Sequence, residues 1–117
     1  MYITTENNTH RKEALDAFET IRNIITRNEK IMIIEDSFNT YENTLEVLNI
    51  YSNLVTTGNY FIVEDSICHR GLEMGPEPGP YEGIQQFIKS NANFIVDKNM
   101  EGNLITLNPN GYLKRIK

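Results

Sequence analysis

The chain has 117 residues, of which 39% are hydrophobic and 23% charged, and its formal net charge is −5. This length is enough for one small domain with a single core, whereas a doubly wound nucleotide-binding enzyme needs roughly twice as many residues. An acidic chain of this kind is a poor partner for a nucleic-acid backbone, so we expect no nucleic-acid binding. The only basic cluster, Lys114-Arg115-Lys117, is interpreted as a solvated C-terminal tail.

No apolar run approaches the roughly 20 residues that a membrane-spanning helix needs, so we expect no membrane insertion. Residues 1–6 have neither the basic nor the apolar region of a signal peptide. Together with the single cysteine, Cys68, these features predict a cytoplasmic protein without disulfides.

Hydrophobic periodicity predicts helices and strands in alternation. Apolar residues at intervals of three and four predict an amphipathic helix over about residues 10–28. The all-apolar run 31–34 predicts a strand that is buried on both faces, as in a parallel sheet covered by helices. Asn39 is expected to cap a second helix, which continues toward Leu54 and ends before Gly58.

A second buried strand is predicted over residues 60–63. After a rigid loop rich in proline and glycine, Pro80 is expected to be the first residue of a third helix. Residues 94–96 and 104–107 are expected to pair as a closing hairpin. The order α-β-α-β-α-β-β indicates one α/β domain over residues 1–117, with a mostly parallel sheet that ends in an antiparallel hairpin.

Carboxylates follow both predicted buried strands, Asp36 after the first and Glu64 and Asp65 after the second. The carboxyl ends of parallel strands meet at one edge of a sheet, and a cluster of carboxylates there suits Mg²⁺ or Mn²⁺. Successive strand residues point to opposite faces, so Glu64 and Asp65 can share one ion only if the chain turns there, and we predict a turn at Asp65. The alternative is that these residues are solvated acids or helix caps.

Three segments carry a more specific signal. They are, in chain order, IIEDSFNTYE (33–42), YSNLV with GNYFIVEDS (51–66), and GP (79–80) with NPNGYLKR (108–115). Together they resemble the cephalosporin hydroxylase family, which includes rhamnosyl O-methyltransferases, over roughly residues 29–117. The resemblance implies the Rossmann-like class I fold of S-adenosylmethionine-dependent methyltransferases, of which this chain covers the fourth to seventh strands. It also implies that Asp36, Glu64 and Asp65 are magnesium ligands.

The chain departs from the family pattern in two places. Nothing in residues 1–30 resembles the glycine-rich turn that holds the cofactor, so the N-terminal cofactor-binding half is expected to be missing, and no cofactor-binding residue is assigned. Asn39 and Asn43 stand where the family tends to have histidines, and an amide cannot accept a proton near neutral pH. His69 is the only nearby imidazole that can replace them as a general base, although a loop histidine is more often simply exposed.

Two functional hypotheses follow. In the first, the chain is an incomplete Mg²⁺-assisted O-methyltransferase that acts on a sugar or small-molecule hydroxyl, is weakly active or inactive alone, and uses S-adenosylmethionine only when a separate N-terminal half completes it. In the second, it is a non-catalytic remnant or a partner-binding domain. In both, one edge of strand 31–34 is expected to be unpaired, which predicts homo-oligomerisation or capture of the N-terminal half. An iron hydroxylase is disfavoured because His10 and His69 lie in unrelated places.

Overall fold

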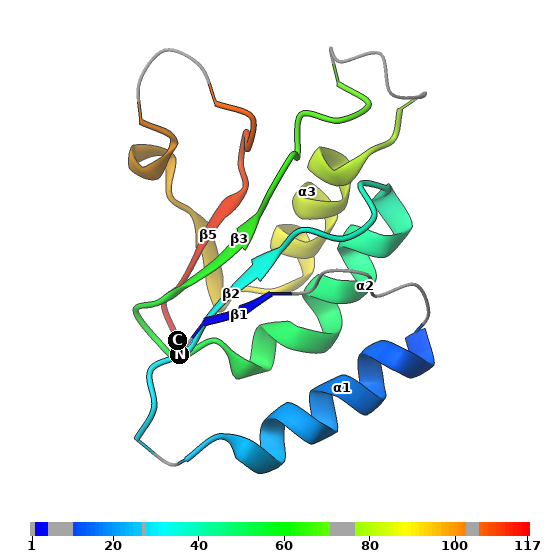
Figure 1. Ribbon diagram of the computed structural model, residues 1–117. Coiled ribbons are helices and arrows are strands. Elements are labelled where there is room, and N and C mark those ends of the chain that lie inside the picture. The colour runs from blue at the N-terminus through cyan, green and yellow to red at the C-terminus, as the bar shows by residue number, and fades with distance from the viewer. Residues whose placement is uncertain (1, 5–10, 27, 71–76, 103–105) are drawn as a thin grey trace.

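The computed structural model describes residues 2–4, 11–26, 28–70, 77–102 and 106–117 (Figure 1). These residues form a five-stranded mixed sheet of order β1-β2-β3-β5-β4 and three α-helices. The elements are β1 (Tyr2–Thr4), α1 (Arg11–Ile24), β2 (Met32–Glu35), α2 (Tyr41–Tyr51), β3 (Tyr60–Val63), α3 (Pro80–Ser90), β4 (Phe94–Val96) and β5 (Tyr112–Arg115). The predicted α/β class is confirmed.

β2 is paired on both sides, which corrects the expectation that strand 31–34 has a free edge. β1 runs parallel to it, with Tyr2 opposite Met32, and β3 runs parallel on its other side, with Phe61 opposite Ile33. β1 was not predicted from the sequence because a three-residue strand is too short to show any periodicity. The proposed binding of a partner through this edge therefore loses its structural basis.

The closing hairpin is also different from the one expected. β4 pairs antiparallel with β5, with Val96 opposite Leu113, and β5 in turn pairs antiparallel with β3. Thr106 and Leu107 belong to no strand, and the other two residues of the expected strand, 104 and 105, lie outside the described residues. β5 was not predicted from the sequence, because charged residues such as Lys114 and Arg115 are uncommon in an internal strand.

Arg115 is held by backbone carbonyl groups, so the solvated-tail interpretation is wrong for it. Its guanidinium Nη1 donates to the carbonyl oxygens of Val55 at 2.6 Å and Asn53 at 3.1 Å, and its Nε donates to the carbonyl oxygen of Lys117 at 2.6 Å. Asn53 lies in the short 3₁₀ turn (Ser52–Leu54) that follows α2, and Val55 comes directly after this turn, where backbone carbonyl groups lack helical partners. Arg115 thus connects the end of this helix to β5.

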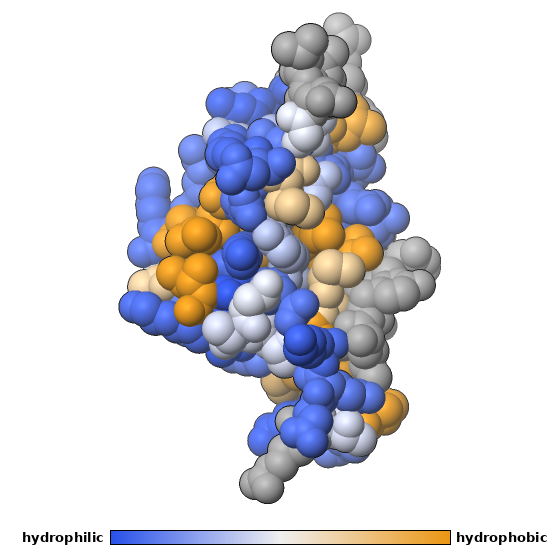
Figure 2. Space-filling view, turned by 90° about the vertical axis from the view of Figure 1, so that its left-hand side faces the viewer, coloured by the Kyte–Doolittle hydropathy of each residue, from blue (hydrophilic) through white to orange (hydrophobic). Residues whose placement is uncertain are grey.

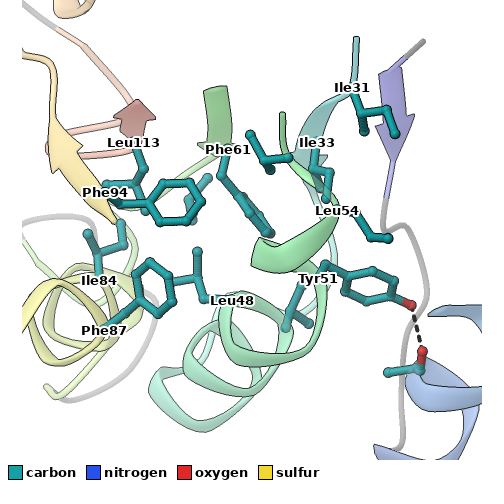
Figure 3. Packing of buried hydrophobic residues seen from close by; sticks show 14 residues of the cluster. Ile31, Ile33, Leu48, Tyr51, Leu54, Phe61, Ile84, Phe87, Phe94 and Leu113 are labelled. Carbon is teal, nitrogen blue, oxygen red and sulfur yellow. Dashed lines mark hydrogen bonds between the residues drawn. The ribbon is translucent and has the colours of Figure 1, made fainter. Parts of the chain in front are cut away.

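The core lies between the sheet and the helices, which pack on the same side of it (Figures 1 and 3). Along β2 and β3 buried and half-buried residues alternate, so that Ile33 and Phe61 face the helices while Ile34 and Ile62 lie on the opposite face. The prediction of burial on both faces is therefore wrong for the described residues. α1 joins this layer through the Tyr51 hydroxyl, which donates to the carbonyl oxygen of Ala14 at 3.0 Å (Figure 3).

Helix starts were predicted to within one residue. α3 begins at Pro80 as expected, and the carboxylate of Glu82 accepts from the N–H of Gly79 at 2.8 Å. The cap of α2 is Thr40 and not Asn39, because the hydroxyl of Thr40 accepts from the N–H of Asn43 at 3.2 Å. None of the helices in the described ranges is long and apolar enough to cross a bilayer.

Candidate functional site at the carboxyl ends of β2 and β3

The two strands that carry the predicted site end side by side. The N–H of Glu64, directly after β3, donates to the carbonyl oxygen of Glu35, the last residue of β2, at 2.9 Å. Asp36 follows Glu35 and is exposed, whereas Glu64 and Asp65 are half-buried. The structure thus places all three predicted carboxylates at one edge of the sheet.

The turn predicted at Asp65 is confirmed. Asp65 has φ 49°, in the left-handed region that aspartate tolerates better than most residues. The turn is fixed by the NPNG segment, since the N–H of Asp65 donates to Asn108 Oδ1 at 2.8 Å and Ser66 Oγ donates to the carbonyl oxygen of Pro109 at 2.8 Å. Two of the sequence motifs therefore meet at this edge.

Gly111 allows this close approach. A Cβ atom at this position would lie 2.3 Å from the carbonyl oxygen of Val63, far inside van der Waals contact. The N–H of Val63 in turn donates to the carbonyl oxygen of Gly111 at 2.8 Å. The glycine of NPNG is therefore required by backbone packing at the start of β5.

The described carboxylates at this edge do not form a complete metal-binding cluster by themselves. Within the described ranges, no group of three or more histidine, cysteine, aspartate or glutamate residues is arranged to hold a metal ion. The structure thus does not gather Asp36, Glu64 and Asp65 into a three-ligand set. The donors at the edge are nevertheless carboxylate oxygens, which suit Mg²⁺ and Mn²⁺, and Mg²⁺ is commonly held by one or two carboxylates with waters and substrate oxygens.

Glu35 was not among the predicted site residues, yet it is 3% exposed and central to the loop after β2. Its Oε1 accepts from the N–H of Ser37 at 3.1 Å, from the Ser37 hydroxyl, and from Asn43 Nδ2 at 3.4 Å. Asn43 Nδ2 also donates to Ser37 Oγ at 2.7 Å and to the carbonyl oxygen of Phe38 at 3.0 Å. A glutamate at the end of an apolar strand was the only sequence signal for this network.

Cys68 and His69 lie in the loop after β3. Burial and the nearby carboxylate of Asp65 raise the pKa of the Cys68 thiol, while a hydrogen bond with Asn39 partly offsets the rise. A buried thiol with a raised pKa is a poor nucleophile, so Cys68 has no activated thiol to offer the site. Asn39 thus reaches across from the loop after β2 and does not cap α2.

His69 adopts a left-handed backbone conformation with φ 62°, and its Nδ1 is buried without a hydrogen-bond partner. The loop packs tightly on the start of α3, since a Cβ atom at Gly79 would lie 2.6 Å from the carbonyl oxygen of Cys68 and 2.8 Å from His69 Cβ. His69 as a general base stays a prediction.

A largely parallel sheet with carboxylates at adjacent strand ends and an antiparallel strand inserted near one edge defines a Rossmann-like α/β domain. A family model described as rhamnosyl O-methyltransferase/CmcI matches residues 12–116, and the chain therefore belongs to this family of Rossmann-like methyltransferases. The resemblance inferred from the three sequence segments is confirmed. The other comparisons found no matching curated protein and no matching solved structure.

Proposed function

We propose that the chain carries the metal-binding part of an S-adenosylmethionine-dependent O-methyltransferase that acts on a hydroxyl group of a sugar or small molecule. Family membership supports the methyltransferase relationship. The observation that carries the proposal is the adjacency of two strand ends, joined by the Glu64 to Glu35 backbone hydrogen bond, with Asp36 and Asp65 directly after them.

A divalent ion held at this edge would orient the substrate hydroxyl and increase its acidity. Asp36 offers an exposed carboxylate, and the left-handed turn at Asp65 redirects the chain so that Glu64 and Asp65 need not point to opposite faces as they would on a regular strand. The amides of Asn39 and Asn43 cannot accept the proton that the hydroxyl loses, which leaves His69 as the imidazole nearest in sequence.

We further propose that S-adenosylmethionine binds only together with residues from a separate N-terminal half. In dinucleotide-binding folds a glycine-rich turn after the first strand brings backbone N–H groups close to the cofactor. The first glycine of this chain is Gly58, so the connection between β1 and α1 contains none. Methyl transfer by the chain alone is therefore expected to be weak or absent.

Binding of Mn²⁺, followed by electron paramagnetic resonance, tests the metal site. The double variant Asp36→Asn, Glu64→Gln should lose binding that the native chain shows. The matched control is Asp16→Asn, Glu19→Gln, which also removes one aspartate and one glutamate charge, but from exposed positions on α1. It should bind Mn²⁺ as the native chain does. Equal binding by all three proteins, or none by the native chain, would contradict the proposal.

A second candidate function is a partner-binding domain, which the uncovered face of the sheet favours. Ile34 and Ile62 are half-buried on this face, and Ile95 of β4 is 44% exposed. Parallel strands are usually covered on both faces, yet the described helices cover only one. Figure 2 shows apolar patches between hydrophilic side chains on the side where β4 and β5 lie. Because β1 occupies the edge of β2, we propose this face, and not that edge, as the surface for a second copy or an N-terminal half.

Self-association through this face is testable by light scattering during size-exclusion chromatography over a range of concentrations. Ile62→Lys should reduce any increase in mass with concentration, whereas Ile24→Lys, at a position 64% exposed on α1, should not. A native chain that stays monomeric at all concentrations would exclude the second copy and leave only the N-terminal half as occupant.

A further inference from the structure

Asp36 is the one exposed carboxylate of the candidate site, and the residues on its two sides are bonded to each other. The N–H and the hydroxyl of Ser37 both donate to the buried carboxylate of Glu35. These hydrogen bonds close a small ring that contains the Glu35 side chain and the backbone of residues 35–37. The ring restricts the directions in which the Asp36 side chain can point.

The ring is connected to α2 by Asn43. Asn43 is the third residue of α2, and its N–H is bound by the capping hydroxyl of Thr40 at 3.2 Å. Its side chain reaches back over the loop, where Nδ2 donates to Ser37 Oγ at 2.7 Å and to the carbonyl oxygen of Phe38 at 3.0 Å. A carbonyl oxygen only accepts, so the amide nitrogen and not the amide oxygen must face the loop.

We propose that Asn43 is a positioning residue for Asp36: through Ser37 and Phe38 it fixes the loop that presents the Asp36 carboxylate to a divalent ion. This inference rests on the proposed metal-binding function. The role requires a hydrogen-bond donor at position 43 and no proton transfer, which an amide satisfies. A positioning role also explains how Asn43 can replace the histidine that the family tends to have at this position.

The test compares three variants by Mn²⁺ affinity. Asn43→Ala removes the donor and should weaken Mn²⁺ binding by about tenfold, the lower end of what loss of a supporting hydrogen bond costs a metal site. Asn43→His places a ring N–H at the same distance along the side chain and should restore most of the affinity. Asn49→Ala, an exposed position on the same helix, is the matched control and should leave the affinity unchanged.

Amide hydrogen exchange of Ser37, measured by NMR without metal, separates the two proposals. Exchange should be slow in the native chain, because the Ser37 N–H donates to Glu35, and faster in Asn43→Ala but not in Asn43→His. A native chain that binds no Mn²⁺ would overturn the metal function, while the exchange rates would still decide whether Asn43 fixes the loop. Unchanged exchange in Asn43→Ala, or faster exchange with unchanged Mn²⁺ affinity, would overturn the positioning role.

Discussion

The interaction of Arg115 with the end of α2 makes a quantitative prediction about stability. Arg115→Ala removes the bonds from Nη1 to the carbonyl oxygens of Val55 and Asn53, at 2.6 and 3.1 Å. A hydrogen bond from a charged donor contributes about 1.5–3 kcal/mol, but Arg115 is only half-buried and water can replace part of the loss. We therefore expect a loss of about 2 kcal/mol in the free energy of unfolding.

Arg115→Lys should lie in between, with a loss of about 1 kcal/mol, because one ammonium group does not reproduce the forked donors of guanidinium. The backbone bonds of β5 remain in both variants, since the N–H of Arg115 still donates to Asn59 and its carbonyl oxygen still accepts from Gly58. The loss in the free energy of unfolding therefore measures the contribution of the Arg115 side chain.

Urea denaturation at constant slope measures this loss, which should lower the midpoint by about 1 to 2 M in Arg115→Ala. Lys117→Ala, in the same basic cluster but exposed, should change the free energy of unfolding by less than about 0.5 kcal/mol. If Arg115→Ala is as stable as Lys117→Ala, the contact with the helix end contributes nothing and the reasoning fails.

Three further predictions concern other parts of the fold. Gly111→Ala should lower the free energy of unfolding by at least about 2 kcal/mol in thermal denaturation, because its Cβ would meet the carbonyl oxygen of Val63 at 2.3 Å. Burial alone would raise the pKa of Glu101, but hydrogen bonds, first from Lys98, outweigh it and leave the pKa below its usual value. The ionised carboxylate therefore stabilises the fold above the unfolded-state pKa of about 4.3, and the stability gap between native and Glu101→Gln should close as pH falls from about 6 to about 3. Cys68 should react with iodoacetamide at least about tenfold more slowly in the folded chain than in urea, because burial and Asp65 raise its pKa.

Each of these three predictions has a control variant or an outcome that would contradict it. Gly58→Ala should cost only about 1 kcal/mol, since Gly58 has φ 87° but nothing within 4 Å of a Cβ atom. If the difference in stability between the native chain and Glu101→Gln does not change with pH, the pKa of Glu101 is not lowered by folding. Asn39→Ala removes the hydrogen bond that opposes the raised pKa of Cys68, and it should slow alkylation further unless it opens the loop.

The sequence predicted those elements whose signal lies within one short segment. The apolar runs at 31–34 and 60–63 correspond to β2 and β3, and Pro80 begins α3. β5 was missed because its stability depends on distant groups: Lys114 lies on the half-buried face, and Arg115 is satisfied by carbonyl groups about 60 positions earlier. A local pattern contains no information about such partners.

The same distinction holds at the candidate site. The positions of Asp36 and Asp65 at the strand ends, and the turn at Asp65, follow from strand geometry and were predicted. Burial of Glu35 was not, because a buried carboxylate needs donors, and these come from Ser37 and from Asn43 in the next helix. The number of helices on each face of the sheet is likewise a property of the assembled chain.

The position of β5 in the sheet constrains the order in which the domain forms during synthesis. β5 lies between β3 and β4, although both are made before it, and its pairing of Lys114 with Tyr60 joins segments far apart in the chain. On the ribosome β1, β2 and β3 can pair early, but β4 has no described strand beside it until residues 112–115 have emerged. Until then, the edge of β3 that β5 will occupy has unpaired backbone groups. Chaperones or a neighbouring nascent chain can bind that edge during this period.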